Sequence, residues 1–451
     1  MRFKSTITKL LVLFSFALMM TFAFVNVHAA EKDITAASGE ATTVTITLGD
    51  EGKIVPQFDG DVTAMRYDYY LDNDGVLSID DQGNYKTLKP GTVFISITGY
   101  QGYEAAYNSN VTINVFPDMT NATLETDTVT VYKIPTYIAK NKPYYDALAT
   151  TMIKLSGDAF INLDDLYGID DYNANDILKY TSSNKSLKLS VTYEGDKIYI
   201  LQEAAKAGKA EITVTLYGKE FKINYESVKA GISDQSYLLV KGKSHQIKVT
   251  GYKGDVVWKS SKPSVASVDE NGKVKGLKTG NCIITAKCGD FYLGCAVSVT
   301  SSKLKKVTER ATYIGTHWKY SQPKRAVNGY YDCSSLVWRA YHEKAGLTFG
   351  TPYYPGNTTT ESAWCKKNGK VLSGAMSNKK ITGMKLNPGD IMFKSYKKKT
   401  KYKTTYHVEM FTGYICTSVE DNGKANYTAL WAARGLYYST YQGYIVARPL
   451  K

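Results

Sequence analysis

The chain has 451 residues, of which 43% are hydrophobic and 22% charged, with a formal net charge of +14. Length and composition exclude a single small domain and suggest about three or four domains. The charge is uneven, because residues 301–451 hold 25 Lys and Arg against 8 Asp and Glu. Residues 1–300 are therefore slightly acidic, and any attraction to an anionic partner resides in the C-terminal third.

Residues 1–30 have the pattern of a secretory signal peptide. Basic residues precede an apolar run over residues 10–25, and small residues at positions 29–30 suit cleavage. The run is short for a membrane span, which disfavours the alternative of a retained anchor. We therefore expect a secreted protein, and outside a cell nucleic acid is not an expected partner.

An ungapped internal repeat follows. Residues 76–98 and 265–287 match at a constant offset, and each copy alternates apolar and polar residues around an Asp-x-x-Gly turn and a Lys-x-Gly turn. A weaker third copy lies at residues 182–214. This pattern predicts short antiparallel strands, so we expect three β-sandwich modules before residue 301.

The third module resembles the bacterial immunoglobulin-like domains of group 2, through the stretch from Trp258 to Ala286. The resemblance is clearest over residues 231–300 and extends to residues 41–117 and 120–228. It implies spacers or adhesive units of exported surface proteins. No position in these modules forms a recognisable catalytic or metal site.

The six cysteines do not have the spacing of a disulfide framework. Three of them share one predicted hairpin, whose Gly-Asp turn would place Cys288 opposite Phe291 and Cys295 opposite Ile284, so that no two thiols face directly. A diagonal bond from Cys282 to Cys295 is the disulfide that this pairing would allow. No histidine lies near these cysteines, which argues against a zinc site.

Cys333 lies at the start of a predicted helix, a position that favours a nucleophilic cysteine. Residues 334–345 have the periodicity of an amphipathic helix that Gly346 ends. Free N–H groups and the positive end of the helix dipole stabilise a thiolate at such a helix start. The alternative, a buried structural cysteine, is disfavoured by the polar neighbours Asp332 and Ser334. The expected apolar stripe of the helix consists of Leu336, Val337, Ala340 and Tyr341.

A histidine on a predicted strand is the candidate base. Residues 406–413 alternate with period two as a half-buried strand and carry His407. His342 lies half a revolution round the helix from Cys333 and roughly 13 Å along it, so it cannot reach the thiol. His317, in a segment that we expect to be a loop, is not excluded by geometry. A strand fixes the direction of His407, so a helix cysteine and this histidine suggest a papain-like peptidase.

The C-terminal region also resembles the NlpC-type cell-wall cysteine peptidases, over about residues 308–451. Three ordered motifs carry the resemblance: Asp-Cys-Ser-Ser-Leu-Val at 332–337, Leu-Asn-Pro-Gly-Asp-Ile-Met-Phe at 386–393 and His-Val-Glu-Met-Phe-Thr-Gly at 407–413. It implies a papain-like α+β fold that hydrolyses stem peptides of peptidoglycan, typically next to D-glutamate. Cys333 and His407 would be catalytic, and neither a metal nor an organic cofactor is expected.

Three further positions are compared with that family's pattern. The family usually has a third polar residue on the strand after the base, but here Trp431 stands there, and an indole cannot accept the imidazole N–H. A backbone carbonyl, a displaced residue such as Asn426, or a two-residue dyad are the alternatives. Trp318 falls where a substrate-contacting tyrosine is usual. Asp332 is interpreted either as a holder of a free substrate amine or as a helix cap.

The expected architecture is multidomain, with all-β immunoglobulin-like sandwiches before an α+β papain-like catalytic domain. The expected boundaries are a signal peptide at 1–30, immunoglobulin-like domains at 31–118, 119–229 (divergent) and 230–301 (group 2), and an NlpC-type domain at 302–451.

The expected function is that of a secreted, monomeric, cell-wall-associated peptidoglycan endopeptidase. Its partners would be stem peptides and, through basic residues at 397–403, anionic wall polymers. The alternative is a wall-binding or adhesive surface protein whose catalytic domain is degenerate.

Overall fold

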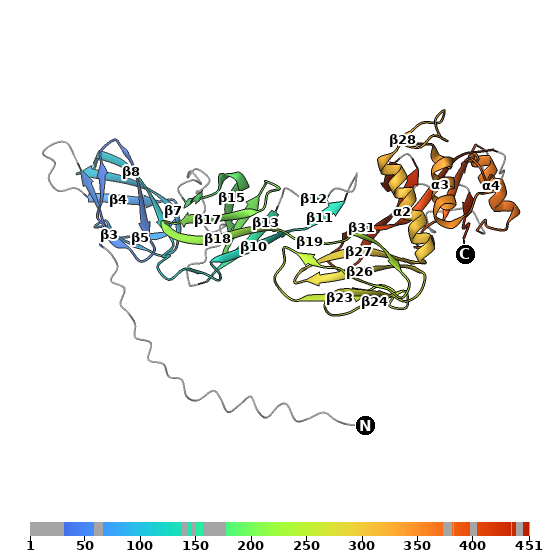
Figure 1. Ribbon diagram of the computed structural model, residues 1–451. Helices are drawn as coiled ribbons and strands as arrows, with labels where there is room; N and C mark the ends of the chain where they lie inside the picture. The colour runs from blue at the N-terminus through green and yellow to red at the C-terminus, as the bar shows by residue number, and fades with distance from the viewer. Residues whose placement is uncertain are drawn as a thin grey trace, which may run out of the picture.

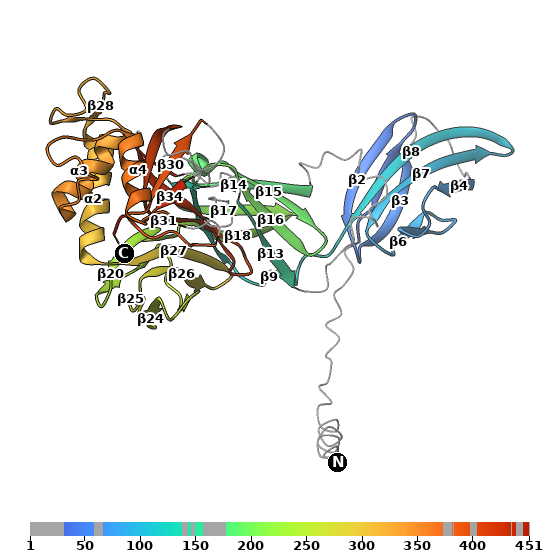
Figure 2. The ribbon, with the colours of Figure 1, turned by 90° about the vertical axis from the view of Figure 1, so that its right-hand side faces the viewer.

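The computed structural model describes residues 31–57, 66–137, 143–145, 149–156, 177–372, 381, 383–396, 404–433, 435–438 and 445–450. Strands dominate, and they form three sandwiches in a row followed by a domain with helices (Figures 1 and 2). The predicted signal peptide and the basic residues 397–403 lie outside the described residues. Among the helices that are described, none is long and apolar enough to cross a membrane.

The first sandwich encloses one apolar core between two four-stranded sheets. Its last long strand pairs in parallel with an early one, which closes one sheet. One sheet consists of β1 (Ile34–Ala37), β3 (Glu51–Gln57), β6 (Asn84–Thr87) and β5 (Leu77–Ile79), and the other of β2 (Ala41–Thr47), β8 (Glu104–Phe116), β7 (Gly91–Gln101) and β4 (Arg66–Leu71).

The second sandwich repeats this plan and adds a short hairpin that extends toward the C-terminal domain. One sheet consists of β10 (Thr128–Lys133), β18 (Lys219–Lys229), β17 (Gly208–Leu216) and β14 (Leu178–Ser182), and the other of β15 (Leu189–Glu194), β16 (Lys197–Gln202), β13 (Ala149–Ser156) and β9 (Thr123–Leu124). The hairpin consists of β11 (Pro135–Tyr137) and β12 (Pro143–Tyr145).

The third sandwich has one four-stranded sheet and a smaller facing layer. The large sheet consists of β20 (Ser236–Val240), β27 (Phe291–Thr300), β26 (Gly280–Cys288) and β23 (Val256–Ser260). The smaller layer consists of β21 (Ser244–Gln246), β25 (Lys273–Gly276) and β24 (Ala266–Val268), beside the pair β19 (Gly231–Ile232) and β22 (Val249–Thr250).

The repeat seen in the sequence is confirmed strand by strand. The strands β5, β6 and β7 begin at the positions that correspond to the starts of β24, β25 and β26. In the turns, Asp80 and Asp269 each accept the N–H groups of the residues two and four positions later. Gly83 and Gly272 have φ values of 83° and 79°, which a side chain rarely adopts. The Asp-x-x-Gly pattern is therefore a turn signature with a direct physical cause.

The predicted cysteine hairpin is confirmed in its register. Cys288 lies opposite Phe291 and Cys295 opposite Ile284, so no two thiols face across the ladder. All six cysteines are free thiols. Burial raises the pKa of five of them, which leaves those thiols protonated and inert. The five are Cys282, Cys288, Cys295, Cys365 and Cys416.

The C-terminal domain packs three helices on one face of an antiparallel sheet. The predicted helix at 334–345 is confirmed as α3 (Cys333–Ala345), with Gly346 as its left-handed cap. The segment before it was expected to be a linker and a loop but is the helix α2 (Ser302–His317), begun by Ser301, whose side chain accepts the N–H of Leu304. The other elements are α4 (Thr358–Lys367), the short pair β28 (Lys319–Tyr320) and β29 (Tyr330–Tyr331), and the sheet β33 (Gly435–Tyr438), β32 (Ala425–Ala433), β31 (Thr405–Val419), β30 (Ile391–Ser395) and β34 (Ile445–Ala447).

The third sandwich covers the opposite face of this sheet (Figure 2). A shared core joins Ile283 and Ala296 of the sandwich to Phe411 of β31. Buried Asn281 donates to two carbonyl groups of the C-terminal domain, at 3.1 and 2.6 Å. The expectation of a half-buried, alternating strand at 406–413 is therefore wrong, because residues 408–413 of β31 are all buried and burial does not alternate along them.

We predict that Gly294→Ala loosens this interface. A Cβ atom at Gly294 would lie 2.6 Å from the sulfur of Cys416 and 2.8 Å from a methyl group of Val419. Overpacking of this kind costs about 1–3 kcal/mol, so the melting temperature of the chain 31–451 should fall by several degrees. Gly75→Ala is the matched control, since its Cβ would meet only the flexible end of Lys89 and the Asn73 side chain at ordinary distances. Equal melting temperatures for both variants would contradict the described packing.

Candidate active site

The structure places Cys333 at the first position of α3, directly after the cap residue Asp332. The Asp332 carboxylate accepts the N–H of Ser335, and the Ser335 hydroxyl accepts the N–H of Asp332 in return. This capping box uses the third N–H of the helix and leaves the first turn around the thiol stabilised and rigid. Cys333 is 5% exposed, more than any of the other five cysteines.

His407 and Cys333 are brought together, as the sequence predicts. Their 74-residue separation in the chain is closed because β31 begins beside the N-terminus of α3 and α4. Burial alone would lower the pKa of His407, but hydrogen bonds with Cys333 and Glu409 raise it to about 9. The imidazole is therefore charged at neutral pH, the state in which it pairs with a thiolate.

Glu409 makes the contact with the imidazole for which the sequence analysis considered Trp431, Asn426, a backbone carbonyl or no third group. His407 Nε2 donates to Glu409 Oε1 over 3.1 Å, and the glutamate is 1% exposed. Lys394 Nζ, on the paired strand β30, lies 2.5 Å from the same oxygen and compensates the buried charge. Since Nε2 faces Glu409, the other ring nitrogen, Nδ1, is the one available to Cys333.

A sequence signal for Glu409 existed. Residues two apart on a strand lie on the same face, so His407 and Glu409 in the motif His-Val-Glu point the same way. The family comparison directed attention to the following strand instead. Lys394 could not have been found from the sequence, because its position opposite His407 depends on the strand register.

Trp431 does not orient the imidazole, which corrects the sequence-based assignment. It is 1% exposed and packs against Phe411, with ring centroids 5.6 Å apart, in the core shared with the third sandwich. Asn426, the alternative, bonds Ser418 and Glu420 in an exposed hairpin. The physical reason is the pleat of the strand, which turns successive side chains to opposite faces of the sheet. Ala432 and its partner Met410 face the helices, so Trp431 and its partner Phe411 face the third sandwich.

The carboxylate of Asp332 is engaged by other groups of the protein. Besides capping α3, its carboxylate lies 2.8 Å from Nε of Arg325, and the residue is 6% exposed. This arrangement favours the cap interpretation over the role as holder of a substrate amine. Trp318 is the C-terminal cap of α2. Its ring centroid lies 4.9 Å from the guanidinium carbon of Arg310 and 5.1 Å from that of Arg339. Arg339 is six residues beyond Cys333, about 9 Å along the helix, so Trp318 borders the seam between α2 and α3.

The two remaining histidines of the domain contact residues of their own helices. His317 ends α2, stacks on Tyr313 with centroids 4.3 Å apart and bonds within its own turn. His342 packs on Trp338 of α3. Among the described residues, His407 is the imidazole that contacts Cys333.

The Asn-Pro-Gly-Asp motif supports the site without entering it. Asp390 is 1% exposed and accepts two hydrogen bonds from Arg448, at 2.7 and 2.8 Å. Gly389, at a φ of 90°, turns the chain so that its carbonyl accepts the hydroxyl of Tyr341 on α3. The turn therefore anchors α3 to β30.

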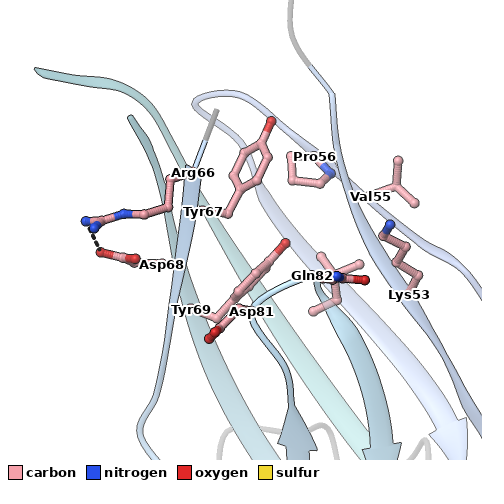
Figure 3. Close-up of a pocket in the computed structure, with 10 residues that line it drawn as sticks. Lys53, Val55, Pro56, Arg66, Tyr67, Asp68, Tyr69, Asp81 and Gln82 are labelled. Carbon is pink, nitrogen blue, oxygen red and sulfur yellow. Dashed lines mark hydrogen bonds and ion pairs between the residues drawn. The ribbon is translucent and has the colours of Figure 1, made fainter. Parts of the chain in front are cut away.

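A separate cavity of about 620 Å³ lies on the first sandwich. Figure 3 shows the rings of Tyr67 and Tyr69 on its wall and an ion pair between Arg66 and Asp68 at 3.2 Å. The rings extend from β4 toward β3, which also lines the cavity. This cavity is distant in sequence from the Cys333 site and belongs to the immunoglobulin-like part of the chain.

One family model matches the third sandwich. Residues 228–292 match the family model of the bacterial Ig-like domain (group 2). This confirms the resemblance of that module and indicates an extracellular or surface-associated bacterial protein. An uncharacterised protein of Clostridium acetobutylicum is 46% identical over 57 residues, which span 12% of this chain and 6% of that protein.

Solved structures with a partial likeness are mostly multidomain surface proteins. Invasin, a bacterial integrin-binding protein, is 15% identical, with 52% of each chain covered and a TM-score of 0.29. A C-terminal fragment of intimin, solved with its receptor's binding domain, is 9% identical, with 72% of this chain and 98% of the fragment covered and a TM-score of 0.24. Domains of the S-layer protein SbsC give 15% identity, 36% and 76% coverage and a TM-score of 0.16. Values this low carry no argument about function.

We predict that Glu409→Gln lowers the pKa of His407. Removing the carboxylate charge removes a group that favours the imidazolium, so the charged form should be lost at lower pH than in the native chain, where the midpoint lies at about 9. NMR titration of the ¹⁵N-labelled imidazole, assigned by its loss in His407→Ala, measures the midpoint. Glu343→Gln, which breaks only the surface pair with Arg310, is the control. An unchanged midpoint in Glu409→Gln would show that the carboxylate does not orient the base.

Proposed function

We propose that this chain is a secreted cysteine peptidase that hydrolyses stem-peptide bonds of peptidoglycan. The observation that carries the proposal is the contact of Cys333 with His407, whose opposite nitrogen is held by Glu409. A thiol at a helix start, an imidazole and a buried carboxylate supply a nucleophile, a base and an orienting group in that order.

The proposed chemistry is acyl transfer. The proton of Cys333 resides on His407 in the resting pair, and the thiolate attacks a peptide carbonyl. Backbone N–H groups at the start of α3 face the oxyanion, and the imidazolium then returns the proton to the leaving amine. Water releases the acyl group from sulfur and restores the thiol. Glu409 Oε1 lies 3.1 Å from His407 Nε2 and 2.5 Å from Lys394 Nζ, so the imidazolium has a fixed partner.

The substrate class rests on the resemblance to NlpC-type enzymes and on charge. The C-terminal third carries the net positive charge of the chain, and anionic wall polymers would attract it within a Debye length. The three sandwiches would then act as a spacer that carries the site away from the N-terminus, as group 2 modules do in exported proteins. Cleavage next to D-glutamate is the bond that the family resemblance favours.

A binding function is the second candidate. The matched immunoglobulin-like module favours a surface or adhesive protein, and in that case the C-terminal domain would keep a groove without turnover. The two candidates differ in one respect that can be measured, since only the first requires the thiol of Cys333.

We predict that the chain 31–451 releases soluble peptide fragments from purified peptidoglycan and that Cys333→Ala abolishes release. His407→Ala should reduce the rate by about two to four orders of magnitude, the usual contribution of a general base. Mass spectrometry of the soluble fraction identifies the bond cleaved. Cys365→Ala, at a buried thiol on α4, is the matched cysteine control.

Release that persists in Cys333→Ala would overturn the peptidase assignment. If neither chain releases fragments but both sediment equally with intact walls, the binding function is the correct one. Thermal melts of all variants exclude loss of folding as the cause.

A further inference from the structure

Two adjoining cavities on the first sandwich form one cleft. The cavity of about 620 Å³ has a neighbour of about 530 Å³, and both are lined by residues of β4 and of the turn between β5 and β6. The lining residues that the two cavities share are Tyr67, Asp68, Tyr69 and Asp81. Each cavity has the size of the pockets that hold small ligands in proteins.

Two tyrosine rings form one wall of this cleft. Tyr67 and Tyr69 are two residues apart on β4, so they lie on the same face of the strand, and their ring centroids are 6.4 Å apart. Both are partly buried, and Figure 3 shows their rings extending toward β3. Burial raises the pKa of Tyr69 to about 12, so its hydroxyl stays protonated at neutral pH.

The cleft also presents polar side chains of both kinds, donors and acceptors. Lys53 lies on β3, and Asp81 and Gln82 lie in the turn that follows β5. The hydrogen bonds that Lys53 and Gln82 make to the other described residues come from their backbone groups. An ammonium and an amide therefore remain available to a ligand, and Asp81 adds a carboxylate acceptor.

The internal repeat shows which ring the fold does not require. Strand β4 pairs with β7 in the same register as β23 pairs with β26, so Tyr67 corresponds to Val256 and Tyr69 to Trp258. In both modules the ring of the second residue covers the glycine of the Asp-x-x-Gly turn. An aromatic residue at that position therefore supports the turn. The position of Tyr67, in contrast, accepts valine in the third sandwich, so its ring has another role in the first.

The lining fits a carbohydrate. Aromatic faces pack against the C–H groups of a sugar ring, and side chains that donate and accept hydrogen bonds bind its hydroxyls. The ammonium of Lys53 disfavours a cation. Carboxylates disfavour an anion, and besides Asp81 the adjoining cavity has those of Asp74 and Asp80. An uncharged, hydroxyl-rich chain meets neither repulsion.

We propose that this cleft binds a glycan chain, with the ring of Tyr67 packed on a sugar face and Asp81 and Gln82 bonded to sugar hydroxyls. The occupant is the glycan strand of the cell wall. This choice rests on the proposed function, since the stem peptides that the Cys333 site would cleave are attached to that strand. Figures 1 and 2 show the first sandwich at the end farthest from the C-terminal domain. A second attachment to the same polymer raises the effective concentration of wall at the distant active site.

The test is the binding of an N-acetylglucosamine hexamer, an uncharged oligosaccharide without peptide, to the chain 31–451 that carries Cys333→Ala. Isothermal titration calorimetry measures the affinity. Tyr67→Val installs the residue that the third sandwich has at this position and should weaken binding about tenfold. Gln82→Ala, in an exposed turn, should weaken it about fivefold. Tyr70→Val is the matched control, because Tyr70 is 71% exposed on the opposite face of the same strand, and it should leave the affinity unchanged.

Absence of hexamer binding, or an unchanged affinity in both Tyr67→Val and Gln82→Ala, would overturn the proposal. Thermal melts of each variant show whether the sandwich stays folded, and Gln82→Ala decides if Tyr67→Val does not. Hexamer binding by a chain that releases no peptide from the wall would count against the peptidase and support the glycan site. Peptide release by the native chain without hexamer binding would overturn the glycan site alone.

Discussion

The sheet of the C-terminal domain is buried on both faces, and the candidate site depends on this. Helices α2, α3 and α4 cover one face, and the third sandwich covers the other. An antiparallel sheet with one exposed face would show alternating polar residues, whereas β31 is apolar on both sides beyond Glu409. The third sandwich and the C-terminal domain therefore share an apolar cluster in addition to the core that each has of its own.

This arrangement explains how the thiol, the imidazole and the carboxylate, which come from different elements, keep fixed relative positions. The thiol is fixed by the capping box of α3, and the imidazole by β31, whose start α4 holds through Thr405. The buried Glu409 and Lys394 are tolerated because each satisfies the other's charge. A site built on packed elements rather than loops maintains the geometry that nucleophilic chemistry needs.

Local patterns predicted much of this fold. The Asp-x-x-Gly turns, the Gly-Asp hairpin and the helix that Gly346 ends all depend on interactions within a few residues, and all were found as expected. Long-range packing was harder to predict. The sequence gives no sign that Phe411 and Trp431 would face another module, so Trp431 was assigned to the site although it lies in a core. Lys394 becomes visible only when β30 is placed in space.

The proposed site requires Cys333 to be an activated thiol among inert ones. Limited alkylation of the native chain 31–451 at neutral pH, with all six cysteine peptides quantified by mass spectrometry, tests this requirement. Cys333 should be modified first and faster than free cysteine, while the thiols buried in the cores stay unmodified. Modification of Cys333 no faster than that of free cysteine would contradict it.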